Sequence, residues 1–367
     1  MHLKHLSIIN FKNCAQADIN LSKKLNCFTG NNGEGKTNLL DAIYYLSFCK
    51  SFFNPIDSQN ILHDAPFFVI QGAFLNDGNE YEIHCGQKRG AKKSFKKNKK
   101  EYQRLSDHIG LIPLVMISPS DSELISEGSE FRRKFIDNVI FQFDKEYLED
   151  LISYNKVLTQ RNALLKNFSK TNSFDYSQLE VWDGQLIPLG ERINKKRKKF
   201  ISQFEPLFQE NYQKISGGKE KVGLTYISSL NEGAFENILE AALPRDRYAE
   251  YTTSGIHKDD LEFTLNNFPI KRFASQGQQK SYLLALKLAQ YYFIFETLGI
   301  TPILLMDDIY DKLDETRMTQ LIQTISHKDF GQVFITDTNY ERMNNLFAKL
   351  HVDYSIFKVE QGAITTN

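Results

Sequence analysis

The residues best suited to chemistry form a glycine-rich stretch near the start of the chain. It reads Gly30-Asn31-Asn32-Gly33-Glu34-Gly35-Lys36-Thr37, with Asn38 directly after it. The spacing G-x-x-x-x-G-K-T is typical of a loop that binds nucleotide phosphates, because backbone N–H groups and the start of the next helix both face the anion. We expect Lys36 to reach the β- and γ-phosphates and the Thr37 hydroxyl to bind Mg²⁺. A chance glycine-rich turn is the alternative.

A second candidate site is a pair of carboxylates. The apolar run Ile303 to Met306 predicts a buried strand, and Asp307 and Asp308 follow it directly. In a phosphate-loop ATPase the first carboxylate holds Mg²⁺ and the second orients or deprotonates the attacking water. We therefore predict that Asp307 binds Mg²⁺ and that Asp308 is catalytic, together with Asp307 and Lys36. Two carboxylates that only cap a turn are the alternative.

A third motif, Ser275-Gln276-Gly277-Gln278-Gln279-Lys280, precedes a long apolar helical pattern. Serine and glycine ahead of a helix can form another anion site at its N-terminus. Alone, this stretch predicts only an ordinary capped helix, but beside the phosphate loop it fits a nucleotide held between two subunits. The last core strand predicted, residues 332–338, ends in Thr336, Asp337 and Thr338, where a γ-phosphate sensor would lie.

Positive charge is concentrated between residues 88 and 100, where every charged side chain is cationic. One interpretation is a basic hairpin tip that contacts a nucleic-acid backbone, and the other is a solvated loop. The formal net charge of the whole chain is +0, so this local excess stands apart. We therefore predict DNA binding through Lys92, Lys93, Lys96 and Lys97. A second cluster, residues 195–199, is predicted to be a solvated helix face.

Composition narrows the class of protein. The 367 residues are 41% hydrophobic, enough for one large domain or two lobes. No signal peptide and no membrane-spanning apolar run is recognisable, so we expect a cytoplasmic protein without a membrane partner. The four cysteines, which form no C-x-x-C pair, are predicted to be reduced thiols rather than zinc ligands. The polar stretch around His257 also lacks the spacing of a hydrolytic zinc motif.

The positioning elements follow from periodicity. Residues 3–30 predict three short strands, the third leading into the phosphate loop, and residues 67–85 predict a hairpin. Residues 121–208 are mainly helical in pattern, without sustained heptads, and residues 220–228 and 261–272 predict strands again. The predicted domains are an ATPase lobe of residues 1–118 and 301–367, a mainly helical second lobe of residues 119–272, and a segment of residues 273–300 with the third motif and its helix.

In this order the motifs resemble the ATP-binding-cassette heads of the SMC class, and within it they are similar to the RecF family of bacterial recombination mediators. The resemblance covers nearly the whole chain. It is carried by Asn10 to Asn13, Gly30 to Asn38, Ser118-Pro119, Arg132-Arg133, Phe135 to Asp137, Gln160 to Asn162, Gly255 with His257 to Asp260, and Ser275 to Lys280. It implies an α/β fold: an ATP-binding-cassette-type phosphate-loop ATPase head, with mixed sheets around the phosphate-loop helix and an inserted helical lobe.

The resemblance also implies a function. ATP and Mg²⁺ would be the cofactors, and Ser275, Gly277 and Gln278 would complete the nucleotide site of a second subunit, with Asp314 at the dimer seam. The protein would be an ATP-dependent homodimer and a weak, DNA-stimulated ATPase. It would bind double-stranded DNA and single-strand/double-strand junctions, and would act with RecR, and with RecO in the same pathway, to load recombinase at gaps.

Two departures and several rivals accompany this interpretation. Lys258 stands where the family usually has arginine, and Phe53 where it often has arginine. A transporter ATPase would usually carry Leu-Ser-Gly-Gly in place of Ser275 to Gln278. A full SMC or RecN-type tether would need a long coiled coil. A nucleotide-gated scaffold, without DNA specificity or without ATP cleavage, is the remaining alternative.

Overall fold

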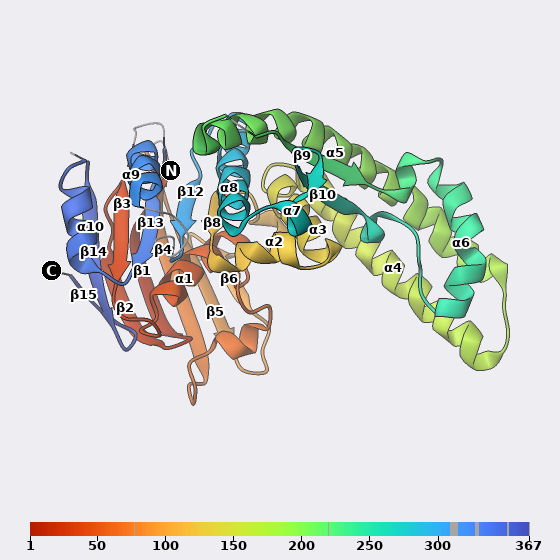
Figure 1. Cartoon of the computed structure of the whole chain (residues 1–367). Helices are drawn as coiled ribbons and strands as arrows, with labels where there is room; N and C mark the ends of the chain where they lie inside the picture. The colour runs from red at the N-terminus through yellow and green to blue at the C-terminus, as the bar shows by residue number, and fades with distance from the viewer. Residues whose placement is uncertain (77, 219, 309–314, 327–329, 351, 367) are drawn as a thin grey trace. The chain divides into compact units, whose positions relative to one another are not determined.

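The computed structural model describes residues 1–76, 78–218, 220–308, 315–326, 330–350 and 352–366 (Figure 1). The chain divides into two units, one of Met1–Asp121 with Gln290–Asn367 and one of Ser122–Ala289. The sequence places lobe boundaries after residues 118, 272 and 300, whereas the second boundary between the units falls within helix α8 (Gln276–Leu298).

The first unit contains an antiparallel sheet built on the N-terminal strands. Its spatial order is β2 (Cys14–Asn20), β1 (His2–Phe11), β4 (Phe67–Asn76), β5 (Asn79–Lys88), β6 (Ser94–Lys97) and β7 (Lys100–Glu101). Buried and exposed residues alternate along β5, as expected for a sheet with one face on the core. The predicted early strands and the hairpin of residues 67–85 are therefore confirmed.

A second, mostly parallel sheet carries the phosphate loop. Its order is β15 (Ala363–Thr366), β14 (Tyr354–Glu360), β3 (Leu25–Thr29), β13 (Val333–Asp337), β12 (Ile303–Met306) and β8 (Leu114–Ile117). Every residue of β3, β8, β12 and β13 is buried, which explains their unbroken apolar runs. Parallel strands end at one edge of a sheet, so the residues that follow β3, β12 and β13 meet there.

Helix α1 (Lys36–Phe48) connects the two sheets of this unit. It contacts β1, β4 and β5 of the antiparallel sheet and β8 and β13 of the parallel sheet. Most of its residues are buried accordingly, and its apolar side chains are spread around the helix rather than along one stripe. Other helices of the unit are η1 (Asp57–Asn60), η2 (Leu105–Asp107), α9 (Glu315–Ser326) and α10 (Tyr340–Phe347), and the last part of α8 also belongs to it.

The second unit is mainly helical, as predicted. Its helices are α2 (Glu123–Ser126), α3 (Ser129–Ile140), α4 (Lys145–Thr171), α5 (Tyr176–Ser216), η4 (Ser229–Asn231), α6 (Phe235–Ala249), η5 (Ile256–Lys258), α7 (Ile270–Phe273) and the first part of α8. The turn predicted at Ser118 to Asp121 is present as η3 (Pro119–Ser122), at the boundary of the units. Figure 1 shows α4 and α5 running alongside one another.

A small antiparallel sheet completes this unit. It consists of β9 (Val222–Ile227), β10 (Asp260–Leu265) and β11 (Phe268–Pro269). The strand predicted over residues 261–272 is too long. Asn266 and Asn267 take φ angles of 49° and 66°, which turn the chain back, and α7 follows.

One charged cluster differs from the sequence prediction. Residues 195–199 lie on α5, but Arg197 does not belong to a solvated face, because only 1% of its surface is exposed. Its guanidinium donates to Asp259 at 2.8 Å and to Asp137 at 2.9 Å. The prediction failed because the buried partners stand far away in the sequence. Within the described part of the chain, no helix has the length and apolar character needed to cross a membrane.

Candidate functional site

The phosphate loop joins β3 to α1, and two of its glycines are in close contact with neighbouring segments. A Cβ on Gly30 would lie 2.3 Å from the carbonyl oxygen of Val359, and one on Gly35 would lie 2.5 Å from Asn13 Oδ1. Gly35 also has a φ of 109° and stands immediately before the first residue of α1. These positions accept only glycine, so the motif spacing has a steric cause here.

Lys36 lies folded over its own loop. Its ammonium donates to the carbonyl oxygens of Gly30 at 2.7 Å and Asn31 at 2.8 Å. The side chain therefore folds back across the phosphate loop that precedes α1. A cation held by two neutral carbonyls can transfer these hydrogen bonds to phosphate oxygens, which are stronger acceptors.

The Thr37 hydroxyl joins the loop to the carboxylate after β12. Its Oγ1 donates to Asp307, at 2.9 Å from Oδ1 and 3.1 Å from Oδ2. Thr336, on β13, also donates to Asp307 Oδ1 at 2.8 Å, and its Oγ1 accepts the backbone N–H of Asp308 at 2.9 Å. Burial raises the pKa of Asp307, and the hydroxyls of Thr336 and Thr37 act in the opposite direction.

These groups border a cavity of about 330 Å³. It is lined by Asn32, Gly33, Gly35, Lys36, Thr37, Asn38, Asp307, Asp308 and Thr336. Asp308 has a φ of 49°, an uncommon conformation for a residue other than glycine, and such conformations often occur at functional sites. The structure thus brings together the predicted catalytic residues and most of the predicted phosphate loop.

The donor set at this cavity fits a magnesium ion that arrives with a nucleotide. A threonine hydroxyl and a carboxylate are oxygen ligands, and Mg²⁺ in nucleotide sites takes few protein ligands with phosphate and water as the rest. Across the described residues there is no group of three or more His, Cys, Asp or Glu side chains placed to hold a metal ion. Thr37 and Asp307, which supply such a hydroxyl and carboxylate in this cavity, are the residues that would hold Mg²⁺.

Asn13, to which the sequence alone assigns no physical role, supports the phosphate loop through hydrogen bonds of its side chain. Its Oδ1 accepts from Asn38 Nδ2 at 2.7 Å, and its Nδ2 donates to the Glu34 carbonyl at 3.2 Å. Lys12 beside it pairs with Asp41 at 2.7 Å and lies 5.3 Å from the centre of the Phe53 ring. A phenylalanine at position 53 thus attracts Lys12, where an arginine would repel it.

At the end of β13, where the sequence predicts a γ-phosphate sensor, Thr336 and Asp337 lie in different environments. Thr336 faces the cavity, whereas Asp337 is 1% exposed and pairs with Arg342 at 2.7 Å. Asp337 also accepts the backbone N–H of Asn339. Thr336 is therefore the better placed of the two. Asp314, predicted at a dimer seam, lies outside the described residues.

The third motif begins α8 in the second unit. The Ser275 N–H donates to Gln278 Oε1 at 2.7 Å, and the Gln278 N–H donates to Ser275 Oγ at 3.3 Å. This reciprocal pair is a capping box, so Gln278 has a local structural role. Ser275 and Gly277 are exposed, and a Cβ on Gly277 would meet open space. Among the described residues nothing explains by steric contact why position 277 is glycine.

The predicted DNA-binding lysines divide into two groups. The basic stretch does form a hairpin, β6–β7, whose turn residues Asn98 and Lys99 have positive φ. Lys92 is exposed and Lys96 partly so, while Lys97 lies over the Tyr81 ring at 4.8 Å. Lys93 points inward, with a side chain 10% exposed and ion-paired to Asp57 at 2.7 Å. Lys93 therefore has a structural role in place of a free surface charge.

The polar stretch around His257 is a structural network. Its Nδ1 lies 2.9 Å from the Tyr154 hydroxyl and its Nε2 lies 2.9 Å from the Thr252 carbonyl. Burial lowers the pKa of His257 to about 4, so the ring is neutral at pH 7. Arg161, from the Gln160 to Asn162 motif, is fully buried and pairs with Asp183 and Asp246. Both ring nitrogens of His257 are used within the protein.

Together, the phosphate loop after β3 and the carboxylates after β12 and beside β13 define an ATPase head of the ATP-binding-cassette type. Comparison with known proteins refines this class. Residues 2–365 match the family described as RecF/RecN/SMC N terminal domain. The chain belongs to the RecF family within it.

Individual relatives agree over the full length. The chain is 54% identical to the DNA replication and repair protein RecF of Phocaeicola vulgatus, covering 100% of this chain and 98% of that protein. It is 49% identical to the protein of that name from Flavobacterium johnsoniae, covering 98% and 100%.

Solved structures extend the comparison to three dimensions. The recombination mediator protein RecF with ATP, in the RecFOR pathway, superimposes with a TM-score of 0.91 at 29% identity, covering 100% of this chain and 97% of that one. The corresponding structure with ATPrS gives 0.90 at 30% identity, covering 100% and 98%. An Smc head domain from Pyrococcus furiosus gives 0.57 at 18% identity, which supports the fold alone.

Proposed function

We propose that this protein is an ATP-dependent, DNA-binding recombination mediator. It binds ATP with Mg²⁺, forms a homodimer around the nucleotide, binds duplex DNA or single-strand/double-strand junctions, and helps to load recombinase during gap repair. RecR, and RecO in the same pathway, are the proposed partners. The observation that carries the proposal is the contact of Thr37 with Asp307 beside Lys36, because it assembles phosphate, metal and water-activating groups in one cavity.

In this proposal, each residue of the candidate catalytic cavity has its own role in ATP binding and hydrolysis. Lys36 binds the β- and γ-phosphates after giving up the carbonyls of Gly30 and Asn31. Thr37 and Asp307 hold Mg²⁺, which supplies Lewis-acid stabilisation of phosphate charge when bound. Asp308 orients the attacking water and accepts its proton, and Thr336 fixes the backbone of Asp308 through its hydroxyl.

The third motif supports a site shared between two subunits. Ser275 and Gly277 are exposed at the start of α8, where a helix N-terminus attracts an anion. The γ-phosphate held by Lys36 of one subunit then contacts Ser275 of another. ATP stabilises the dimer and slow hydrolysis releases it, so the ATPase acts as a switch and DNA stimulates it.

Sedimentation of the purified protein with ATP, with duplex DNA, with both and with neither tests the proposal. We expect a monomer to dimerise with ATP and Mg²⁺, and DNA to co-sediment with the dimer. A monomer under every condition would contradict it. Phosphate release with and without duplex DNA separates the proposed ATPase from a nucleotide-gated scaffold, which would bind ATP and release no phosphate.

A further inference from the structure

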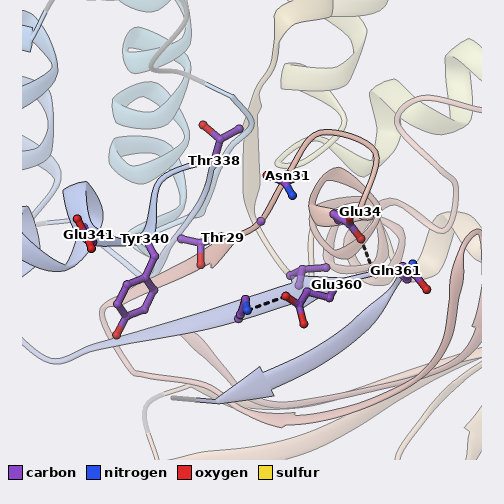
Figure 2. A pocket seen from close by; sticks show the side chains of 11 residues that line it. Thr29, Asn31, Glu34, Thr338, Tyr340, Glu341, Glu360 and Gln361 are labelled. Atoms are coloured by element: carbon purple, nitrogen blue, oxygen red, sulfur yellow. Dashed lines mark hydrogen bonds and ion pairs between the residues drawn. The ribbon is translucent and has the colours of Figure 1, made fainter.

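A second, larger cavity adjoins the phosphate loop in the first unit. Its volume is about 730 Å³. It is bounded by the end of β3 and the start of the phosphate loop, by Thr338 and the first residues of α10, and by the β14–β15 hairpin (Figure 2). Gly30 and Asn31 line this cavity, and Asn32 and Gly33 line the candidate catalytic cavity. The two cavities therefore border successive residues of one loop.

This larger cavity is acidic. Its charged lining residues are Glu34, Glu341, Glu360 and Lys358. Lys358 pairs with Glu360 at 2.6 Å, and Glu34 accepts the backbone N–H of Gln361, as the dashed lines in Figure 2 show. Glu341 is exposed and makes no ion pair within the described residues. A cation that enters the cavity would therefore meet an uncompensated carboxylate at Glu341.

The second unit exposes a segment of complementary character directly before Ser275. Phe268 is 56% exposed and Phe273 is 65% exposed, and their ring centres lie 5.2 Å apart. Arg272 is also exposed, with no ion pair among the described residues. Lys271 donates to the Ser126 carbonyl. Two neighbouring exposed phenylalanine rings beside an exposed arginine are typical of an interaction surface, where such residues supply much of the binding energy.

We propose that Phe268 to Phe273 of one copy of the chain occupies the acidic cavity of a second copy, with Arg272 paired to Glu341. This inference rests on the proposed ATP-dependent dimer and adds a specific contact to it. Arg272 stands three positions before Ser275, so the two are at most about 11 Å apart along an extended chain. When Ser275 of one copy reaches the phosphate loop of the other, Arg272 and the two rings come within reach of the cavity beside that loop.

The aromatic segment and the acidic cavity are complementary in charge and in apolar surface. Arg272 brings a positive charge to a cavity with an excess of glutamate, and opposite charges at an interface favour one docking geometry over others. Phe268 and Phe273 bury their exposed apolar surface against Tyr340 and the stem of Lys358, which line the same cavity. The contact forms only when a second copy is present, so it makes dimerisation depend on more than the nucleotide itself.

Complementary charge reversal tests the contact in the full-length protein. Arg272→Glu and Glu341→Arg each place like charges together when the variant pairs with itself. We expect each alone to weaken the ATP-dependent dimer on the order of tenfold in Kd, measured by sedimentation with ATP and Mg²⁺. A mixture of the two variants should dimerise as the unmodified protein does, because both contacts of the mixed dimer join opposite charges. The glutamate introduced at position 272 meets the arginine introduced at position 341, and the native Arg272 of the second variant meets the native Glu341 of the first. Lys199→Glu, an exposed charge reversal on α5, is the matched control and should leave the dimer unchanged.

Three outcomes would overturn the inference, each distinguishable from failure of the proposed function. The first is that both single variants dimerise normally while Ser275→Arg blocks the dimer. This result would support the ATP site shared between subunits and would show that the Arg272–Glu341 contact does not contribute to the dimer. The second is a mixture that dimerises no better than its components. The third is loss of duplex binding by Arg272→Glu with an unchanged dimer, which would assign the aromatic segment to DNA. If the unmodified protein itself does not dimerise with ATP, the result contradicts the proposed ATP-dependent dimer, and with it the inference that rests on this dimer.

A double variant tests the contact independently of charge. Phe268→Ser combined with Phe273→Ser removes the exposed rings, and neither ring belongs to the buried core. We expect the monomer to keep its thermal unfolding midpoint and ATP affinity, and the dimer to weaken on the order of tenfold. A dimer of unchanged stability would contradict the proposed role of the rings.

Discussion

Thr37 Oγ1 donates a hydrogen bond to Asp307 Oδ1 across 2.9 Å, although 270 positions separate the two residues in the chain. The contact exists because β3 and β12 end at the same edge of the parallel sheet, on either side of β13. It places a hydroxyl and a carboxylate where both can face a metal ion bound to phosphate.

Thr37→Ala tests the role of this hydroxyl. We expect the variant to need at least about tenfold more Mg²⁺ for half-maximal ATP hydrolysis, because one oxygen ligand is removed and Asp307 no longer accepts its hydrogen bond. The measurement is phosphate release during a Mg²⁺ titration. Thr37→Ser is the matched control, because it keeps the hydroxyl and should stay within about twofold of the unmodified protein. Equal Mg²⁺ dependence in all three proteins would remove Thr37 from the metal site.

Lys36→Met should weaken nucleotide binding severely. The ammonium forms charge-assisted hydrogen bonds, and removing about 3 kcal/mol of such interactions lowers ATP affinity roughly a hundredfold. Lys36→Arg keeps the positive charge and should still bind ATP, while a bulkier guanidinium slows turnover. Calorimetric titration with ATP and Mg²⁺ measures binding. A Lys36→Met variant that still dimerises with ATP would contradict the proposed mechanism.

The basic hairpin predicts a salt-dependent interaction with DNA. Changing Lys92, Lys96 and Lys97 to Glu should weaken duplex binding, and the slope of log K against log salt should fall by about 0.9 for each phosphate that no longer meets a lysine. Fluorescence anisotropy with labelled duplex at several salt concentrations measures both quantities, and ATP affinity should not change. Unchanged DNA affinity would remove the hairpin from the interface.

Lys93 serves as the contrasting position in this hairpin. Its ammonium donates to Asp57, to the Tyr45 hydroxyl at 3.0 Å and to the Cys49 carbonyl at 2.6 Å. Lys93→Met should therefore lower the thermal unfolding midpoint, whereas Lys92→Met should not. Equal midpoints would show that these hydrogen bonds contribute nothing measurable to stability.

The sequence predicts the parts of this site that depend on local chemistry. Glycine spacing, the apolar run before Asp307 and the alternation in β5 all report on neighbours a few positions away. It does not reveal that Arg197 and Lys93 turn inward, because their partners Asp259 and Asp57 come together only in the folded chain. It does not single out Thr336 over Asp337 either, since that choice depends on which face of β13 meets the cavity.

His108 predicts a pH dependence of stability. It is fully buried, its Nε2 lies 2.7 Å from the Leu46 carbonyl, and burial lowers its pKa to about 4. The unfolded chain, with an ordinary histidine pKa near 6.5, binds the proton first as the pH falls. Stability is therefore full above about pH 6.5 and decreases between about pH 6.5 and 4, by up to about 3 kcal/mol from this residue.

The measurement for His108 is urea unfolding at pH 7 and pH 5. His108→Gln should show less of the decrease seen in the unmodified protein, because glutamine does not titrate in this range. His63→Gln is the matched control, since the His63 side chain is 93% exposed. Parallel pH profiles for the unmodified protein and His108→Gln would contradict the assignment.

The second unit contains buried ion pairs centred on Arg197. Arg197 is paired with Asp137 and Asp259, and it also donates to the Ile256 carbonyl at 2.8 Å. Removing one partner of a buried pair leaves an uncompensated charge, at a cost of about 3–5 kcal/mol. Arg197→Met should lower the free energy of unfolding of the second unit by this amount, measured with urea. Lys199→Met, an exposed change on the same helix, should cost less than about 0.5 kcal/mol.

The same variant has a local consequence that separates Arg197 from its neighbours. Because Asp259 adjoins Lys258 and the start of β10, removing Arg197 should also release this loop, and hydrogen exchange at residues 256–260 should rise before global unfolding. Similar stabilities for Arg197→Met and Lys199→Met would show that Arg197 is dispensable. They would leave the Tyr226 hydroxyl, which also donates to Asp259, as the group that holds this carboxylate.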